Sequence, residues 1–343
     1  MFDIDKIVRD NVKSLVPYSC ARDEFMGNEG TFLDANENPF GKLNRYPDPY
    51  QRELKNAISK SKGIDISKIF LGNGSDEIID LSYRVFCNPG TDKSLIFTPT
   101  YGMYEVSAAV NNITVIKMPL DDNFLIKLNE VKPYLTDKNL KIIFICSPNN
   151  PTGNCMDPGV VEKIIAGFEG IVVIDEAYID FTGKPSFINL LDKYRNLIVM
   201  QTFSKAMGLA AIRVGMAFAD PAIVRYFNKM KPPYNISTIN QKTALKKLEK
   251  TGEKKRQIEK IITERERLIG KLVELELTEY VYPSDANFLL VKVCNADSIY
   301  NKLVDSGIVV RNRNNIIRNC LRITVGKREE NNRLINALKK MDL

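Results

Sequence analysis

A lysine flanked by small residues follows a strongly apolar stretch of this sequence. Lys205 lies in the segment Thr202-Phe203-Ser204-Lys205-Ala206-Met207-Gly208, directly after Leu197-Ile198-Val199-Met200, which is predicted to be a buried strand. An amine must be uncharged to form an imine, and desolvation together with a cationic neighbour such as Arg213 lowers the pKa of a lysine. The pattern therefore predicts a Schiff-base lysine. The alternative is a lysine at a strand end with its amine in water.

A carboxylate ends another apolar strand earlier in the chain. Asp175 follows Ile171-Val172-Val173-Ile174, and its separation from Lys205 suits neighbouring strands of one sheet joined by a helix. A buried carboxylate is costly unless it has a partner, and beside a ring nitrogen it would keep that nitrogen protonated. Tyr178 follows closely and can reach the same site. The alternative is a surface Asp-Glu pair that caps a helix.

Two segments together can bind a phosphate group. The run Gly72-Asn73-Gly74-Ser75-Asp76-Glu77 follows a short apolar strand and precedes residues with the apolar spacing of a helix. Such a turn presents backbone N–H groups at the positive end of a helix dipole. Ser75 and Asp76 are also ordinary capping residues, so the turn alone is a weak signal. With Ser204 and Arg213, which can donate to the same anion, it predicts a phosphate-binding site.

Composition excludes several classes of protein. The 343 residues include no histidine, which removes Ser-His-Asp and Cys-His catalysis and argues against a catalytic metal centre. Six cysteines without a CxxC pair indicate reduced thiols, a cytoplasmic setting and no zinc site. The net charge of +7 is interleaved with acidic residues, so we expect no nucleic-acid partner. We also expect no membrane span and no secretory signal at the N-terminus.

The elements that must position these residues alternate along the chain. From about residue 69 to about residue 220, apolar strands alternate with helical segments, which predicts a mostly parallel α/β sheet. The candidate residues follow the carboxyl ends of the strands, where such sheets bind ligands. The length fits two domains. We predict a large domain over residues 31–245 and a smaller α+β domain built from residues 1–30 and 246–343, with one long helix over residues 241–275.

The order of these motifs resembles the fold-type-I aminotransferases that depend on pyridoxal 5'-phosphate (PLP). The resemblance rests on Thr202-x-Ser204-Lys205-Ala206-x-Gly208 with Arg213, on Asp175-Glu176-Ala177-Tyr178 and on Asn150-Pro151-Thr152-Gly153. It extends nearly from end to end of the chain. The resemblance implies a large PLP-binding domain whose mostly parallel sheet is covered by helices, a smaller α+β domain, PLP as the cofactor and a homodimer.

The resemblance also implies a role for each matched residue. Lys205, Asp175 and Tyr178 would be catalytic: the lysine would bind PLP and shuttle a proton, the aspartate would protonate the pyridine nitrogen, and the tyrosine would bind the ring oxygen. Asn150 would also bind the ring oxygen, and Tyr101 would stack on the ring. The remaining residues expected to bind the cofactor are Gly74, Ser75, Asp76, Ser204, Arg213 and, from the partner subunit, Tyr46.

A further group of residues bears on the substrate. Arg322 lies inside an apolar strand, which suits either an edge position or a guanidinium that binds a carboxylate or phosphate through two hydrogen bonds. The positions that resemble the histidinol-phosphate aminotransferase branch of the family, and that would bind substrate, are Tyr18, Asn36, Tyr46, Asn287, Arg311 and Arg322. The stretch from Arg313 to Asn319 matches that branch loosely, so Arg313 competes with Arg311 for the second anion site.

The implied reaction transfers the amino group of L-histidinol phosphate to 2-oxoglutarate, giving imidazole acetol phosphate and L-glutamate in histidine biosynthesis. An aromatic amino-acid aminotransferase is one alternative. A PLP-dependent decarboxylase of a phosphorylated amino acid such as phosphothreonine is another, because it shares the fold and the arginines. Release of carbon dioxide without any keto acid would distinguish it. A non-catalytic PLP-binding protein is a third hypothesis, against which the complete pair of Asp175 and Lys205 speaks.

Overall fold

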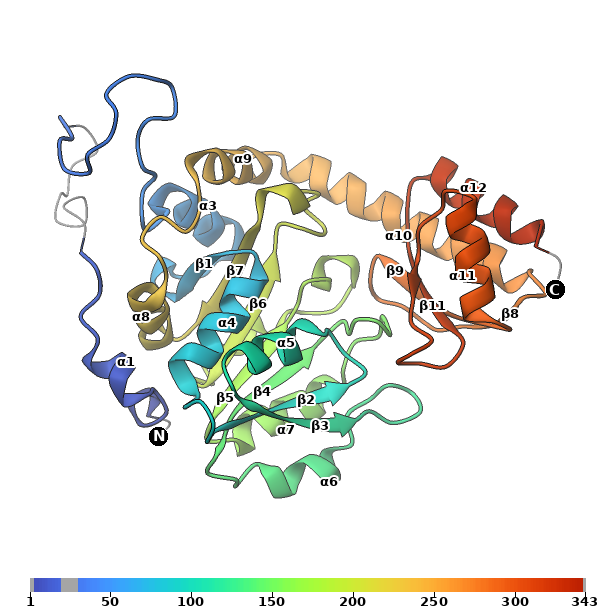
Figure 1. The fold of residues 1–343 in the computed structure, drawn as a ribbon, viewed down its shortest axis with the longest axis horizontal. Helices are drawn as coiled ribbons and strands as arrows, with labels where there is room; N and C mark the ends of the chain where they lie inside the picture. The colour runs from blue at the N-terminus through green and yellow to red at the C-terminus, as the bar shows by residue number, and fades with distance from the viewer. Residues whose placement is uncertain (1–2, 20–29, 342–343) are drawn as a thin grey trace.

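The computed structural model describes residues 3–19 and 30–341, which form two β-sheets, each with its own helices (Figure 1). Cys20 and the rest of the predicted N-terminal arm as far as residue 29 lie outside the described residues. The larger sheet is built from the first two thirds of the chain and the smaller one from the last third.

The larger sheet has seven strands in the order β1-β7-β6-β5-β4-β2-β3. Strands β2 to β6 pair in parallel, whereas β7 runs antiparallel to both β6 and β1. The predicted mostly parallel sheet is therefore confirmed. Its strands are β1 (Ile69–Asn73), β2 (Lys93–Thr98), β3 (Thr114–Pro119), β4 (Leu140–Cys146), β5 (Ile171–Asp175), β6 (Leu197–Thr202) and β7 (Val214–Ala219).

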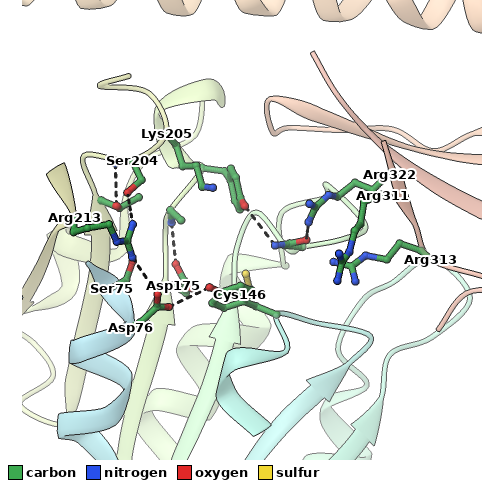
Figure 2. Close-up of a pocket in the computed structure, with 15 residues that line it drawn as sticks. Ser75, Asp76, Cys146, Asp175, Ser204, Lys205, Arg213, Arg311, Arg313 and Arg322 are labelled. Atoms are coloured by element: carbon green, nitrogen blue, oxygen red, sulfur yellow. Dashed lines mark hydrogen bonds and ion pairs between the residues drawn. The ribbon is translucent and has the colours of Figure 1, made fainter. Parts of the chain in front are cut away.

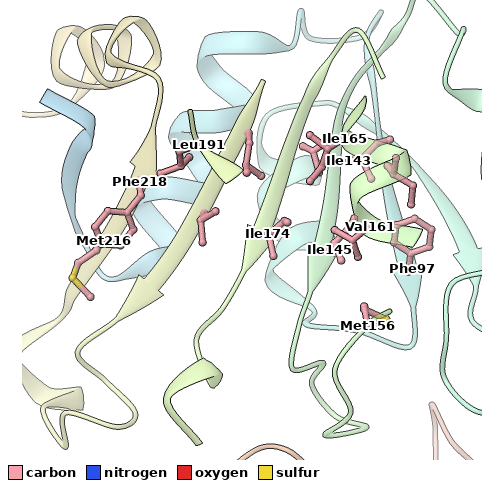
Figure 3. Close-up of a cluster of buried hydrophobic side chains, with 14 of the residues drawn as sticks. Phe97, Ile143, Ile145, Met156, Val161, Ile165, Ile174, Leu191, Met216 and Phe218 are labelled. Atoms are coloured by element: carbon pink, nitrogen blue, oxygen red, sulfur yellow. The ribbon is translucent and has the colours of Figure 1, made fainter. Parts of the chain in front are cut away.

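Helices cover both faces of this sheet, which is why its central strands are apolar along their whole length. Successive residues of a strand point to opposite faces, so Ile143 and Ile145 enter one core cluster and Ile142 and Phe144 enter the other. Figure 3 shows part of the first cluster. The covering helices are α3 (Arg52–Lys62), α4 (Ser75–Phe86), α5 (Met103–Val110), α6 (Leu128–Val131), α7 (Pro158–Gly167), α8 (Pro221–Met230) and α9 (Thr238–Leu248).

Strands β5 and β6 are neighbours, as the separation of Asp175 and Lys205 predicts. The helix expected between them is absent, and this part of the prediction is wrong. The connection instead contains two short 3-10 turns, Ile179–Phe181 and Phe187–Leu190. Gly183 and Pro185 lie between the turns, where a glycine has low helix propensity and a proline lacks the N–H that an α-helix needs.

The smaller sheet is antiparallel, with the strand order β10-β11-β9-β8. Its apolar core, which includes Leu268, Leu289, Leu303 and Ile323, is separate from the two clusters of the larger sheet. The elements are α10 (Thr251–Val273), β8 (Thr278–Val281), β9 (Phe288–Val293), α11 (Ala296–Asp305), β10 (Arg311–Asn312), β11 (Cys320–Thr324) and α12 (Arg328–Lys339).

The single helix expected over residues 241–275 is two helices, α9 and α10, so that prediction is also wrong. The chain leaves the helical conformation at Lys250, whose φ of −98° and ψ of 49° lie outside the α region. Gly252 is the second residue of α10, and glycine disfavours a helix interior by about 1 kcal/mol relative to alanine. The charged residues of this region hid the break because they support helices on both sides of it.

The first residues of the chain pack on the larger sheet. Ile4, Val8 and Val12 are buried in the cluster that contains Phe86 of α4, and the N–H of Arg9 donates to the carbonyl of Val85. The prediction grouped residues 1–30 with the smaller domain, whereas this part of the arm contacts the larger one. The domain boundaries as such stay a prediction.

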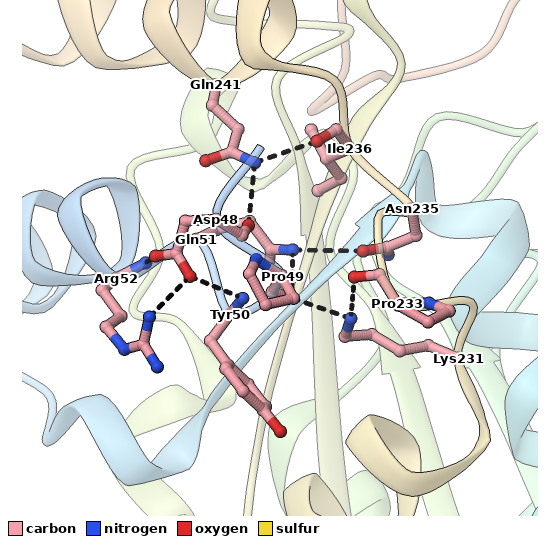
Figure 4. Close-up of polar contacts among 10 residues, drawn as sticks. All are labelled: Asp48, Pro49, Tyr50, Gln51, Arg52, Lys231, Pro233, Asn235, Ile236 and Gln241. Carbon is pink, nitrogen blue, oxygen red and sulfur yellow. Dashed lines mark hydrogen bonds and ion pairs between the residues drawn. The ribbon is translucent and has the colours of Figure 1, made fainter. Parts of the chain in front are cut away.

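The buried side chain of Lys231 connects the segment before β1 to the segment after β7 (Figure 4). The ammonium of Lys231 donates to the carbonyl oxygens of Pro49 (2.8 Å), Pro233 (2.9 Å) and Pro232 (3.2 Å). A buried charge needs such hydrogen bonds to offset the loss of water. Close by, Tyr46 stacks on Tyr234 with ring centroids 4.4 Å apart. The contacts of Lys231 therefore fix the loop that carries Tyr46.

Candidate active site

A cavity of about 320 Å³ lies where the carboxyl ends of β4, β5 and β6 face the smaller sheet (Figure 2). Its volume falls within the range of small-molecule sites. It gathers side chains from segments that are far apart in the sequence. The predicted site residues that line it are Ser75, Asp76, Tyr101, Asn150, Asp175, Tyr178, Ser204, Lys205, Arg213, Arg311 and Arg322.

The carboxylate of Asp175 is 4% exposed and ends β5 at the floor of the cavity. It accepts hydrogen bonds from the hydroxyl of Tyr104 (2.8 Å) and from the N–H of Ala177 (3.0 Å). Burial raises the pKa of this carboxyl, and the two hydrogen bonds act in the opposite direction. A cationic ring nitrogen is a partner that would keep the carboxylate ionised.

Lys205 follows β6 and directs its amine over the ring of Tyr178, 5.5 Å from the centroid. Desolvation lowers the pKa of the ammonium, the charge of Arg322 lowers it further, and Asp175 opposes both effects. We expected Arg213 to be the cationic neighbour. Arg213 does contribute, but less than Arg322, which comes from the smaller sheet. The structure therefore supplies the two conditions that favour an uncharged amine.

The phosphate-binding elements meet at the start of α4. Arg213 has a left-handed backbone (φ 50°), and its Nη1 lies 3.5 Å from the hydroxyl of Ser204. Its Nη2 donates to Asp76 (3.2 Å), which also accepts from the hydroxyl of Tyr101 (3.1 Å). Ser75 opens α4, so its backbone lies at the positive end of the helix dipole. An anion held here would contact a helix N-terminus, two hydroxyls and a guanidinium.

Glycines keep this corner open. Gly74 has a φ of 76°, and a Cβ added to it would lie 2.5 Å from Nη2 of Arg213. A Cβ on Gly215 of β7 would lie 2.5 Å from the backbone nitrogen of Ser75 and 2.4 Å from the carbonyl carbon of Gly74. Any larger residue would fill the space between β7, the arginine and the helix start. This cradle, with the amine of Lys205 and the carboxylate of Asp175, fits a phosphorylated aromatic aldehyde such as PLP.

The smaller sheet joins the site through Arg322. Its Nη1 donates to the side-chain oxygen of Asn150 (2.6 Å), and the amide nitrogen of Asn150 lies 3.4 Å from the hydroxyl of Tyr178. Burial raises the pKa of the Tyr178 hydroxyl, so it stays protonated and can donate. The three residues form one chain of polar contacts that crosses the cavity.

Besides Gly74, which lies next to Arg213, four of the predicted residues do not line this cavity. Tyr18 is exposed on the N-terminal arm, Asn36 is exposed in a loop farther along the chain, and Tyr46 is half exposed in its own loop. Asn287 precedes β9, where its carbonyl accepts from the N–H of Val325. The roles expected for these four residues stay predictions. Between Arg311 and Arg313, which the sequence left open, the structure makes no choice because both line the cavity.

Sequence reasoning missed several side chains of the site. Tyr104 binds Asp175 from the buried face of α5, where it stacks on Phe144 with ring centroids 4.8 Å apart. Cys146 and Thr202, which end β4 and β6, also line the cavity. Their position at strand ends was a usable signal for these two. Tyr104 gave none, because its helix also contains the polar residues Glu105 and Ser107.

Two classes of site are not found in the described part of the chain. Within residues 3–19 and 30–341, no three histidine, cysteine, aspartate or glutamate side chains are grouped to hold a metal ion. None of the helices in these residues combines the length and the apolar composition that a membrane span requires.

Comparison with known proteins agrees with this geometry. The family model of aminotransferase class I and II matches residues 28–338. Histidinol-phosphate aminotransferase of Parabacteroides distasonis is 54% identical over 346 residues, which is 100% of both chains. The crystal structure of histidinol-phosphate aminotransferase from Clostridium acetobutylicum has a TM-score of 0.80 at 27% identity and covers 87% of this chain and 90% of its own.

A second solved structure, histidinol-phosphate aminotransferase from Sinorhizobium meliloti in complex with pyridoxal-5'-phosphate, has a TM-score of 0.80 at 24% identity, with 89% of each chain covered. At that identity the likeness shows the fold, which is the one that the sequence motifs predict. The family model spans most of the chain, and the relative from P. distasonis matches it from end to end. The chain therefore belongs to the class I and II aminotransferase family, in the branch that contains the histidinol-phosphate aminotransferases.

Proposed function

We propose that this protein is a PLP-dependent transaminase that moves the amino group of L-histidinol phosphate to 2-oxoglutarate, giving imidazole acetol phosphate and L-glutamate in histidine biosynthesis. One observation carries the proposal: a single cavity has a desolvated amine, a buried carboxylate and two separate anion-binding groups. Two anion sites suit a phosphorylated cofactor and a phosphorylated or dicarboxylic substrate. The full-length relatives that carry this enzyme name support the choice of donor.

When bound, PLP supplies a carbonyl carbon that links to amines and a ring that accepts electrons. In our assignment, its phosphate is held by the start of α4 with Ser75, Ser204 and Arg213. Asp175 faces the ring nitrogen and keeps it protonated. The remaining contacts come from Tyr101 to the ring face and from Asn150 and Tyr178 to the ring oxygen. The cradle left by Gly74 and Gly215 supports this placement.

In this assignment, Nζ of Lys205 moves the proton of the reaction. It takes the proton from the α-carbon of the amino donor as a general base and delivers a proton as a general acid in the return direction. The lowered pKa of the amine supports this role because only the uncharged form can accept a proton. The aromatic ring of Tyr178 lies under the amine, 5.5 Å from ring centroid to Nζ, and helps to orient it.

Arg322 and Arg311 bind the anionic end of each substrate in turn. The donor brings a phosphate and 2-oxoglutarate brings a carboxylate, and a guanidinium fork can hold either through two hydrogen bonds. Both side chains enter the cavity from the smaller sheet, opposite the phosphate-binding corner (Figure 2). That separation supports a substrate that spans from Lys205 to the smaller sheet.

The protein also acts as a homodimer in this proposal, with the loop before α3 providing Tyr46 to the cofactor phosphate of the partner. Leu33 is 88% exposed and Phe40 is 82% exposed in the same region, and contact with a second copy would bury both side chains. Tyr18 and Asn36 also precede α3 and lie outside the cavity of their own chain. We place the enzyme in the cytoplasm because its cysteines are scattered without pairing motifs.

Absorption spectroscopy of the purified protein with PLP tests the proposal. L-histidinol phosphate added without a keto acid should bleach the visible band of the bound cofactor, and 2-oxoglutarate should restore it. A band that persists with this donor, but responds to an aromatic amino acid, would overturn the substrate. Carbon dioxide released from phosphothreonine without a keto acid would make the protein a decarboxylase. Failure to acquire any visible band would remove PLP from the site.

A further inference from the structure

Three arginines share one face of the smaller sheet. In the antiparallel pair of β10 and β11, Arg311 lies directly opposite Arg322. Arg313 directly follows β10, and its N–H donates to the carbonyl of Cys320 on β11, so the extended pairing continues to this residue. All three line the cavity, and Figure 2 shows their guanidinium groups directed into it. The register of the sheet therefore aims three positive charges at one place.

Carboxylates do not balance the charge of this cluster in the described part of the chain. Among the described residues, no ion pair joins any of the three arginines to a carboxylate. Like charges directly opposite each other in a strand pair are destabilising. Desolvation lowers the pKa of Arg313 to about 10, and the charges of Arg322 and Arg311 contribute in the same direction. An anion bound among the three guanidinium groups would offset this repulsion.

The side chains also have unused hydrogen-bonding capacity. Nε of Arg313 and Nε of Arg322 are buried, and neither has a hydrogen-bond partner among the described residues. A buried donor without a partner is destabilising. A ligand with several acceptor oxygens would satisfy both groups. A phosphate monoester offers three such oxygens, whereas a carboxylate offers two.

Hydrogen bonds hold the backbone of Arg313 in place. Its N–H donates to the carbonyl of Cys320 (2.9 Å), and its carbonyl accepts from Ile316 (2.8 Å) and Ile317 (2.8 Å). The turn that begins at Arg313 is thus closed on itself and on β11. The guanidinium starts from a fixed point at the rim of the sheet, so it can act as a positioned charge.

We propose that Arg313 is a specificity-determining residue, the third guanidinium of a clamp that selects a doubly charged phosphate monoester over a singly charged carboxylate. This inference rests on the proposed function, because it assumes that the amino donor carries the phosphate. A dianion attracts a fixed positive charge twice as strongly as a monoanion at the same distance. Arg311 and Arg322 serve both ligands, whereas the added charge of Arg313 favours the phosphate.

The test compares two unreactive ligands of similar length, propyl phosphate and butanoate, by calorimetric titration of the PLP-loaded enzyme. Neither ligand has an amine, so binding is measured apart from turnover. The variants are Arg313→Gln, Arg313→Lys and Arg318→Gln. Arg318 is a matched control because it is exposed in the same connection between β10 and β11 and does not line the cavity. The absorption of the bound cofactor shows that each variant is folded and loaded.

We expect Arg313→Gln to lower the affinity for propyl phosphate about tenfold, which corresponds to about 1.4 kcal/mol of binding free energy. The binding of butanoate should lose about half as much free energy, which is about threefold in affinity, because its charge is half as large. Arg313→Lys should retain the preference for phosphate, and Arg318→Gln should change both affinities by less than about twofold. The second pKa of a phosphate monoester is about 6, so acidification should weaken propyl phosphate more in the wild type than in Arg313→Gln.

Three results would overturn the inference. An equal fold-loss for both ligands would make Arg313 a general anion-binding or structural residue, and no loss for either would remove it from the clamp. A wild-type enzyme that binds neither ligand would contradict both the proposed clamp and the proposal that the amino donor is phosphorylated. A wild type that binds propyl phosphate, with an unaffected Arg313→Gln variant, would overturn the role of Arg313 alone.

Discussion

Arg322 donates a 2.6 Å hydrogen bond to Asn150, and this contact links the smaller sheet to the loop after β4. Asn150 also lies 3.4 Å from the hydroxyl of Tyr178. The residue expected to bind the substrate anion is therefore in contact with the residues expected to bind the ring oxygen of the cofactor. A substrate that draws the guanidinium of Arg322 toward itself would release Asn150 to the cofactor. The two halves of the site are coupled through one side chain.

The amine of Lys205 is the group on which the proposed chemistry depends. Its substitution in Lys205→Ala removes both the covalent link to PLP and the proton carrier, so turnover should fall by about 10³-fold or more. Borohydride reduction provides a second measurement, since it should attach PLP permanently to the wild type and not to the variant. Lys246→Ala, at an exposed lysine of α9, is the control. Near-normal turnover in Lys205→Ala would end the assignment.

Tyr104 should tune the acid side of the pH profile. Its hydrogen bond lowers the pKa of Asp175, so Tyr104→Phe should raise that pKa. The activity that requires the ionised carboxylate would then be lost at a higher pH, with the acid limb shifted upward by about one pH unit. Tyr83→Phe is the matched control because Tyr83 is also buried and bonds Ser94 and the carbonyl of Tyr104. An unshifted limb would separate Tyr104 from Asp175.

Arg322 should control how readily the apoprotein takes up PLP. Its charge lowers the pKa of Lys205, so Arg322→Met should raise it and leave less uncharged amine at neutral pH. The initial rate at which the visible band appears after PLP is added should therefore reach its maximum at a higher pH in this variant. Arg318→Met changes the net charge equally at an exposed position and should leave the profile in place. The same profile in both variants would contradict the electrostatic argument.

Gly215 should be required for cofactor binding. A methyl group there would press on the backbone between Gly74 and Ser75, so Gly215→Ala should cost about 1–3 kcal/mol of stability and weaken PLP binding. Thermal unfolding and PLP titration measure the two effects separately. Gly270→Ala is the opposite case because Gly270 lies in α10 with open space around it. That variant should gain about 0.5–1 kcal/mol and bind PLP normally.

Mixed dimers test whether Tyr46 acts across a subunit interface. Lys205→Ala and Tyr46→Phe should each impair the homodimer. A hybrid dimer of the two variants has one site with an intact Lys205 and an intact Tyr46 from the neighbouring chain. Activity should therefore rise above that of either parent after the subunits exchange. An activity that stays at the mean of the two parents would place Tyr46 in the site of its own chain, or outside both.

The parallel sheet could be predicted because its physical cause is local. Strands covered on both faces must be apolar along their length, as in Ile171–Asp175 and Leu140–Cys146, and the residue at the end of each strand enters the ligand-binding edge. That rule placed Asp175 and Lys205 together before any contact was known. The motifs of the family then assigned their neighbours.

The rest depends on tertiary contacts that no local pattern encodes. Tyr104 reaches Asp175 only because α5 packs with that face on Phe144. Arg322 lowers the pKa of Lys205 more than Arg213 does, because the smaller sheet lies over the cavity. The positions of these residues in the sequence do not reveal that arrangement. The two-residue strand Arg311–Asn312 is likewise too short for periodicity, although its register places Arg311 opposite Arg322.

The hydrogen bonds of Lys231 have a consequence for the order in which the protein is built. They tie Pro49, near the start of the chain, to Pro232 and Pro233, which the ribosome adds only after all seven strands of the larger sheet. A domain folds as a unit during synthesis. The loop that bears Tyr46 can therefore be fixed only late, when most of the chain has emerged. In the proposed dimer, the surface that carries Tyr46 would therefore be complete only after this region is translated.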